Sequence, residues 1–96
     1  MDLLFGKSQY LKEELLKGAE VVDVRNSIEF KGGHIKGSVN IPLNTIASNE
    51  LRLKEINAKI IFCCASGNRS GQATSIMQNK GLDCINGSSW LNVNKY

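Results

Sequence analysis

Apolar residues recur along the chain with two different periods, which predict short strands alternating with helices. Compact apolar runs predict four strands, at residues 19–24, 38–42, 59–63 and 82–85. Helical spacing predicts helices at residues 7–18, 43–57, 70–81 and 88–96, with one further helical turn at 27–31. Ser8 is expected to cap the first helix, whereas Gly18 and Gly81 are expected to end the first and third.

Strands that alternate with helices favour an α/β fold, in which a small, mostly parallel central sheet is flanked by helices. The run at 59–63 is the most hydrophobic, so it is expected to form a central strand. Ninety-six residues suit one modest core, and the chain contains no linker, repeat or low-complexity stretch. We therefore expect a single domain over residues 1–96.

The charge pattern and the hydrophobicity of the chain argue against nucleic-acid and membrane partners. The formal charge is +3, but the lysines and arginines are scattered without aromatic interleaving, so no nucleic-acid partner is expected. No apolar run is long enough to span a bilayer, and the first residues lack the features of a signal peptide. These observations predict a cytoplasmic protein without a membrane partner.

The chain has three cysteines, Cys63, Cys64 and Cys84, an odd count that fits no disulfide framework. Cys63 and Cys64 are adjacent, so they lack the spacing of a metal clamp, and a disulfide between them would be strained. The only histidine, His34, lies far upstream, and we expect no metal site. The pair is left with two interpretations, which are packing at the end of a buried strand or nucleophilic chemistry.

The segment after the two cysteines favours the nucleophilic interpretation. It reads "ASGNRS" and leads from the predicted central strand into a predicted helix. Ligands in α/β sheets bind beyond the carboxyl ends of strands, and a helix N-terminus offers unpaired N–H groups and a positive dipole end. Small residues at Ala65, Ser66 and Gly67 allow these N–H groups to surround an anion, and Arg69 adds a positive charge. The spacing predicts a reactive thiolate that faces a small anion.

Three segments together resemble rhodanese-like domains. "DVRNSIEFKGGHIKGSVNIP" is similar to the first signature of that family, and "CASGNRSGQA" is similar to its active loop, C-x-x-G-x-R-S. The tail "GLDCINGSSW" is similar to the usual ending of the family, although it is shorter by a residue or two. The three motifs occur in the expected order from Val22 to Trp90.

The resemblance implies a thiosulfate sulfurtransferase that works without a cofactor. In such enzymes, the loop cysteine takes the outer sulfur of a small anionic donor such as thiosulfate, becomes a persulfide, and passes the sulfur to cyanide or a thiol acceptor. Nothing in the sequence suggests an obligate oligomer, so a monomer is expected.

Either Cys63 or Cys64 could be the nucleophile, depending on the cysteine from which the loop motif is counted. Counting from Cys64 gives the rhodanese loop, with Gly67 three residues on and Arg69 five residues on. Counting from Cys63 gives five residues before Arg69, which is formally the signature of cysteine phosphatases. The position of Gly67, the accompanying motifs and the lack of a clear general-acid aspartate favour Cys64, which leaves Cys63 as a packing residue.

The predicted site comprises Cys64 as catalytic residue and six substrate-binding residues: Ala65, Ser66, Gly67, Asn68, Arg69 and Arg25. The alternative for Arg25 is a surface ion pair, with Glu29 as a candidate partner. By the resemblance, Asp23 and His34 are expected to be structural, and Cys84 to lie in the core. Two alternative functions stay open, which are a sulfur carrier or interaction module fed by a partner protein, and a phosphatase or arsenate reductase of the same fold that uses Cys63.

Overall fold

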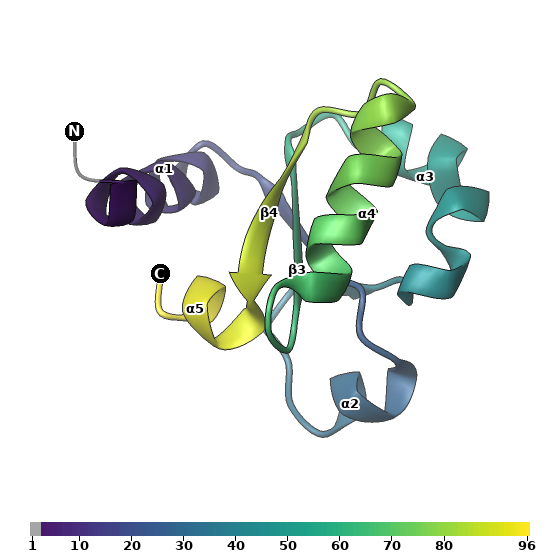
Figure 1. The fold of residues 1–96 in the computed structure, drawn as a ribbon, viewed down its shortest axis with the longest axis horizontal. Coiled ribbons are helices and arrows are strands. Elements are labelled where there is room, and N and C mark those ends of the chain that lie inside the picture. Colours follow the sequence, from purple (N-terminus) through teal and green to yellow (C-terminus); the bar gives the residue numbers. More distant parts are fainter. Residues whose placement is uncertain (1–2) are drawn as a thin grey trace.

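The computed structural model describes the backbone of residues 3–96 and the side chains from residue 9 onward, and these residues form a four-stranded parallel sheet between helices (Figure 1). The strands are β1 (Glu20–Asp23), β2 (Val39–Asn40), β3 (Ile60–Cys64) and β4 (Cys84–Ser89), in the order β2-β1-β3-β4. All three pairings are parallel, with β1 and β3 in the middle of the sheet. The predicted α/β class and the central position of the 59–63 run are confirmed.

The helices are α1 (Leu3–Leu16), α2 (Ser27–Lys31), α3 (Glu50–Lys54), α4 (Asn68–Asn79) and α5 (Trp90–Asn94). Two short 3-10 turns, Leu43–Thr45 and Ala47–Asn49, precede α3 where the sequence predicted one continuous helix. The first helix begins at Leu3, so Ser8 lies inside it and the predicted cap at Ser8 is wrong. Gly18 follows its end with a φ of 97°, a left-handed conformation that glycine adopts without a Cβ penalty.

Side chains alternate across the sheet and build two apolar layers. Phe62 and Cys64 face a cluster that includes Ala73 and Met77 of α4, while Ile61 and Cys63 face a cluster with Leu11 of α1 and Val93 of α5. The strand β3 is completely buried on both faces, which explains its nearly continuous run of apolar residues.

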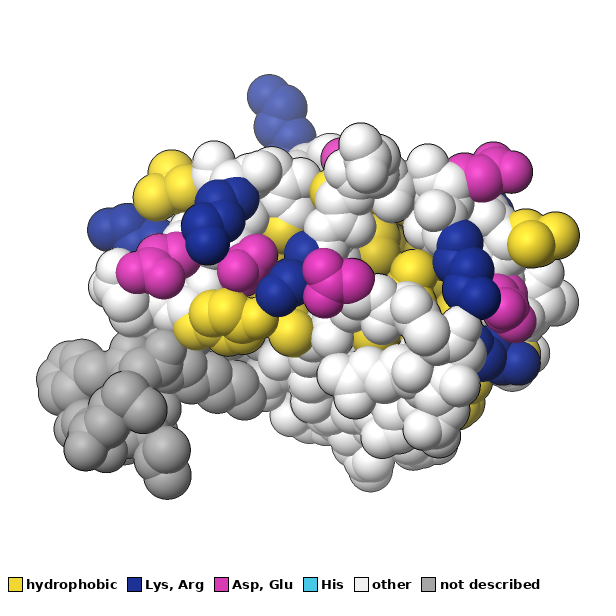
Figure 2. All heavy atoms as spheres, turned by 90° about the horizontal axis from the view of Figure 1, so that it is seen from above, with side chains coloured by type: hydrophobic (Ala, Val, Ile, Leu, Met, Phe, Trp, Pro, Cys, Tyr) yellow, Lys and Arg dark blue, Asp and Glu magenta, His cyan; other side chains and the backbone are white. Residues whose placement is uncertain are grey.

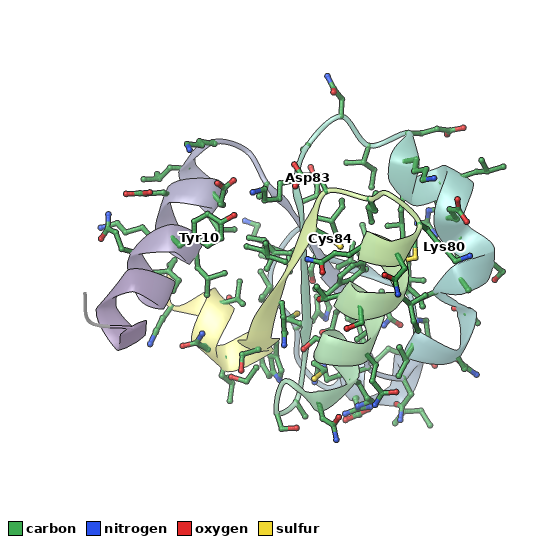
Figure 3. The ribbon with its side chains drawn as sticks, turned by 45° about the horizontal axis from the view of Figure 1, so that its top comes forward. Tyr10, Lys80, Asp83 and Cys84 are labelled. Carbon is green, nitrogen blue, oxygen red and sulfur yellow. The ribbon has the colours of Figure 1, made fainter. Side chains whose placement is uncertain are left out.

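Because the strands are parallel, their carboxyl ends all lie at the lower edge of the sheet in Figure 1, close to α2. The opposite end carries a mixed network in which Lys59 Nζ lies 2.6 Å from the Tyr10 hydroxyl oxygen and 3.8 Å from Asp83 Oδ1. Tyr10 and Asp83 are marked in Figure 3, and Figure 2 shows that acidic and basic side chains are interspersed on this end. Within residues 3–96, none of the helices combines the length and hydrophobicity that a membrane crossing requires.

Candidate active site

The loop between β3 and α4 encloses the sulfur of Cys64. The backbone N–H of Gly67 donates to Cys64 Sγ at 3.0 Å, and the backbone N–H of Ser70 does so at 3.4 Å. The Ser70 hydroxyl oxygen lies 3.3 Å from the same sulfur. The helix α4 begins at Asn68, two residues earlier than predicted, because Gly67 serves as its left-handed N-cap residue and turns the chain directly from the loop into the helix.

This arrangement changes the acidity of Cys64. Burial acts to raise the pKa of the thiol, but hydrogen bonds from the Ser70 hydroxyl and from the backbone N–H groups of Ser70, Gly67 and Ser66 together lower it below its ordinary value. The thiolate of Cys64 is therefore more stable than that of an ordinary cysteine, at a position whose exposed fraction is 0%. A stabilised thiolate is a nucleophile, and because this one is buried, the loop must move before a donor can reach the sulfur.

Gly67 is required at its position for two reasons. Its φ is 103°, a conformation that costs other residues about 1–2 kcal/mol. A Cβ on Gly67 would also lie 2.9 Å from the Ser88 hydroxyl oxygen, so the loop rests closely against the end of β4.

The end of β4 supports the loop through an irregularity in the sheet. The register shifts between Phe62 and Cys64, and Ser88 adopts a φ of 72° there. Asn86 lies before this shift, and its Oδ1 accepts the Ser88 backbone N–H at 2.8 Å and the Ser70 hydroxyl at 2.7 Å. Its Nδ2 donates to the Gly67 carbonyl at 3.3 Å. Asn86 thus fixes both sides of the loop, a role that the sequence did not reveal.

Cys63 has a different environment from Cys64. Its side chain packs in the apolar layer on the opposite face of the sheet, and its exposed fraction is also 0%. Burial raises the pKa of its thiol to about 12, and the nearby Asp23 contributes to this increase. The thiol of Cys84, between β4 and α4 in Figure 3, lies 3.7 Å from the Thr74 carbonyl oxygen, and burial raises its pKa to about 11. The loop geometry therefore gives no support to the register that counts from Cys63.

Arg69 leaves the loop toward α2 and binds a carboxylate there. Its two terminal nitrogens lie 2.6 Å and 3.0 Å from the carboxylate oxygens of Glu29. This bidentate pair lowers the pKa of Glu29 to about 2, chiefly through the hydrogen bond with Arg69. The contact joins α2 to the start of α4 across the carboxyl edge of the sheet.

Arg25 is buried and also paired, but with Asp23 instead of Glu29. The two side chains share hydrogen bonds of 2.7–3.0 Å, and the guanidinium donates to the Gly33 carbonyl at 2.7 Å. The Trp90 ring lies 4.8 Å from the Arg25 guanidinium carbon. Arg25 thus pairs with Asp23, and the suggested surface ion pair between Arg25 and Glu29 is wrong. The same contacts agree with the structural assignment of Asp23.

The remaining predicted residues lie around the loop. Ala65, Ser66 and Asn68 are exposed on its outer side, where Asn68 Oδ1 accepts a hydrogen bond from Gln72 at 3.3 Å. His34 contacts the Phe30 carbonyl oxygen through Nδ1 at 2.7 Å, which agrees with its structural assignment. Among the described side chains, His, Cys, Asp and Glu do not gather in the groups of three that would suggest a metal site.

Comparison with known proteins agrees with this geometry. The model of the rhodanese-like domain family matches residues 7–89. The chain is 31% identical over 78 residues to the thiosulfate sulfurtransferase GlpE of Pseudomonas fluorescens, covering 81% of this chain and 68% of that relative. It is 37% identical over 65 residues to the uncharacterized protein YqhL of Bacillus subtilis, covering 66% of this chain and 49% of YqhL. The chain thus spans about half the length of that relative.

Two solved structures extend the comparison. A rhodanese-related protein from Thermoplasma volcanium superimposes with a TM-score of 0.76 at 30% identity, covering 92% of this chain and 86% of that one. The human single-domain sulfurtransferase TSTD1 superimposes with a TM-score of 0.70 at 24% identity, covering 88% of each chain, which shows a shared fold. The sequence match, the parallel sheet and the loop around Cys64 lead to one conclusion: the chain belongs to the rhodanese-like domain family.

Proposed function

We propose that this protein is a sulfurtransferase of the thiosulfate sulfurtransferase type, in which Cys64 carries sulfane sulfur as a persulfide. The observation that carries this proposal is the convergence of two backbone N–H groups and one hydroxyl on Cys64 Sγ. Such donors stabilise the thiolate before the reaction and the anionic outer sulfur after it. The matched relative GlpE, a thiosulfate sulfurtransferase, supports the same chemistry.

The reaction consists of two displacements at sulfur. The Cys64 thiolate attacks the outer sulfur of thiosulfate, the S–S bond of the donor breaks, and sulfite leaves with the electron pair. In the second step, cyanide or a thiolate attacks the outer sulfur of the Cys64 persulfide, which releases thiocyanate or a new persulfide and restores the Cys64 thiolate. The protein supplies the nucleophile and the N–H cradle, and the sequence implies neither a metal nor an organic cofactor.

The exposed loop residues Ala65, Ser66 and Asn68 remain predicted contacts for the donor and acceptor, as do Gly67, Arg69 and Arg25. Since both arginines are paired with carboxylates, the backbone N–H groups are expected to contribute most to anion binding. We place the protein in the cytoplasm as a monomer, in line with the sequence.

Intact-mass measurement tests the proposal. Reduced wild-type protein, Cys64→Ser and the matched controls Cys63→Ser and Cys84→Ser are incubated with thiosulfate and freed from excess reagent. We expect one added sulfur atom in the wild type and in both controls, its removal by cyanide, and its absence in Cys64→Ser. A label that disappears with Cys63→Ser would overturn the assignment of the nucleophile. A label obtained only from a partner's persulfide would instead identify a sulfur carrier.

A further inference from the structure

The cap at the start of α2 orders the Glu29 side chain independently of its contact with Arg69. At the start of α2, the Asn26 side chain accepts the Glu29 backbone N–H at 2.8 Å, and Glu29 Oε1 accepts the Asn26 backbone N–H at 3.2 Å. This reciprocal capping fixes the carboxylate at the first turn of the helix. Arg69 then binds both carboxylate oxygens, so that its guanidinium meets a partner that is already ordered.

The ion pair with Glu29 neutralises the positive charge of Arg69, which was predicted from the sequence to bind the anionic donor. Arg69 lines a hollow of about 280 Å³ at the carboxyl edge of the sheet, together with Asn26, Asn44 and three apolar or proline residues. Among the residues that the structure describes, Arg69 is the charged one that lines this hollow, and its charge is opposed by Glu29. The second predicted arginine, Arg25, is neutralised by Asp23.

An anionic donor that uses Arg69 must compete with Glu29. Thiosulfate carries its negative sulfonate directly beside the sulfur that reacts, so it would bring this charge close to the Glu29 carboxylate or displace that carboxylate from the guanidinium. In the persulfide of a thiol, R–S–SH, the outer sulfur is bonded to an uncharged sulfur that carries carbon, so no negative oxygens lie beside the reacting atom to compete with Glu29. Charge next to the reacting sulfur is therefore the property that this site discriminates against.

We infer that Glu29 is a specificity-determining residue, which neutralises Arg69 and makes thiol persulfides better sulfur donors than thiosulfate. This inference rests on the proposed function. In the favoured reaction, the Cys64 thiolate attacks the outer sulfur of R–S–SH, the S–S bond of the donor breaks, and the thiolate R–S⁻ leaves with the electron pair and takes a proton from water. Cys64 becomes the persulfide Cys64–S–SH, and sulfane sulfur passes on without an external oxidant.

The test compares kcat/KM for thiosulfate and for glutathione persulfide in the wild type and in Glu29→Gln. Glutamine keeps the capping hydrogen bond to Asn26, since its carbonyl oxygen also accepts an N–H, but it removes the negative charge. Glu50→Gln is the matched control, because Glu50 is also paired with basic side chains, Lys54 and Lys80, and lies on α3.

We expect the wild type to prefer the persulfide. In Glu29→Gln, kcat/KM for thiosulfate should rise about fivefold because KM falls, which is the size of effect that one exposed ion pair produces. The persulfide value should change by less than about twofold, and Glu50→Gln should change neither. A wild type that prefers thiosulfate would overturn the inference without any variant, as would a Glu29→Gln protein that leaves the donor ratio unchanged. If neither donor places sulfur on Cys64, the proposed function fails as well, and intact mass shows this separately.

Discussion

Replacement of Ser70 by alanine isolates one contribution to the reactivity of Cys64. The substitution removes the hydroxyl 3.3 Å from the sulfur but keeps the Ser70 and Gly67 backbone N–H groups in place. Asn86 Oδ1, a second partner of that hydroxyl, still accepts the Ser88 N–H. The third contact of the hydroxyl, with the Ser88 carbonyl oxygen, is long at 3.5 Å. The short hydrogen bond that is lost leaves its acceptor paired, so Ser70→Ala is expected to fold.

The size of the effect follows from the strength of one hydrogen bond to an anion. Such bonds contribute about 1.5–3 kcal/mol. The lower end applies here because the hydroxyl also bonds to Asn86 at 2.7 Å and has only one proton to donate. Since one pKa unit corresponds to about 1.4 kcal/mol, the pKa of Cys64 should rise by about one unit. Below that pKa, the thiolate fraction and the rate of sulfur uptake should fall about tenfold.

The ultraviolet absorbance of the thiolate, followed against pH, measures this change without a bulky reagent having to reach a buried sulfur. Cys63 and Cys84 do not interfere, because burial raises their pKa values to about 12 and about 11. The matched control is Ser75→Ala, an exposed position on the same helix, which should titrate like the wild type. An unchanged or lowered pKa in Ser70→Ala would refute the reasoning.

Three further predictions concern the support of the site. Gly67→Ala should lower the free energy of unfolding by about 1–3 kcal/mol in a denaturant titration, because alanine resists a φ of 103°. It should also slow sulfur uptake by protein that is still folded, and an unchanged rate of uptake would contradict this prediction. Arg25→Met should cost about 3–5 kcal/mol in the same titration, because it leaves the fully buried Asp23 carboxylate without its cation, and a cost below about 1 kcal/mol would contradict it. The pKa of Glu29 is lowered from 4.5 to about 2 in the folded state, so its contribution is present above pH 4.5 and lost as the pH falls toward 2. With one third of the side chain exposed, we expect about 1–2 kcal/mol of stability to disappear over this range in the wild type and not in Glu29→Gln, as measured by denaturation at several pH values.

Most of the fold could be predicted because local patterns determine it. The apolar runs marked all four strands, and the turn-rich segment contained α2 at Ser27–Lys31 as expected. The boundaries that failed depend on other information. The helix α4 begins at Asn68 because Gly67 adopts a left-handed conformation against Ser88, a contact between segments that are distant in the sequence.

The candidate site shows the same division. The order of cysteine, glycine, arginine and serine in one short segment predicted a thiolate loop, and the structure places Gly67 and Ser70 around Cys64. Arg69 turns away from the sulfur and binds Glu29 instead. Asn86 and Glu29 were not assigned to the site, because they reach it from β4 and α2, 16 and 40 residues away from their partners. A loop motif indicates the nucleophile but not the neighbouring elements that hold its donors or balance its charges.

The pleat of β3 has a practical consequence for the two neighbouring cysteines. One peptide bond separates Cys63 from Cys64, yet the sheet places them in separate apolar layers. Slow labelling of Cys63 would require its layer to open, whereas Cys64 needs only a movement of the loop. We therefore expect the two adjacent thiols to report on different motions: labelling of Cys64 should follow the occupancy and opening of the site, and labelling of Cys63 the opening of the apolar layer between the sheet and α1 and α5.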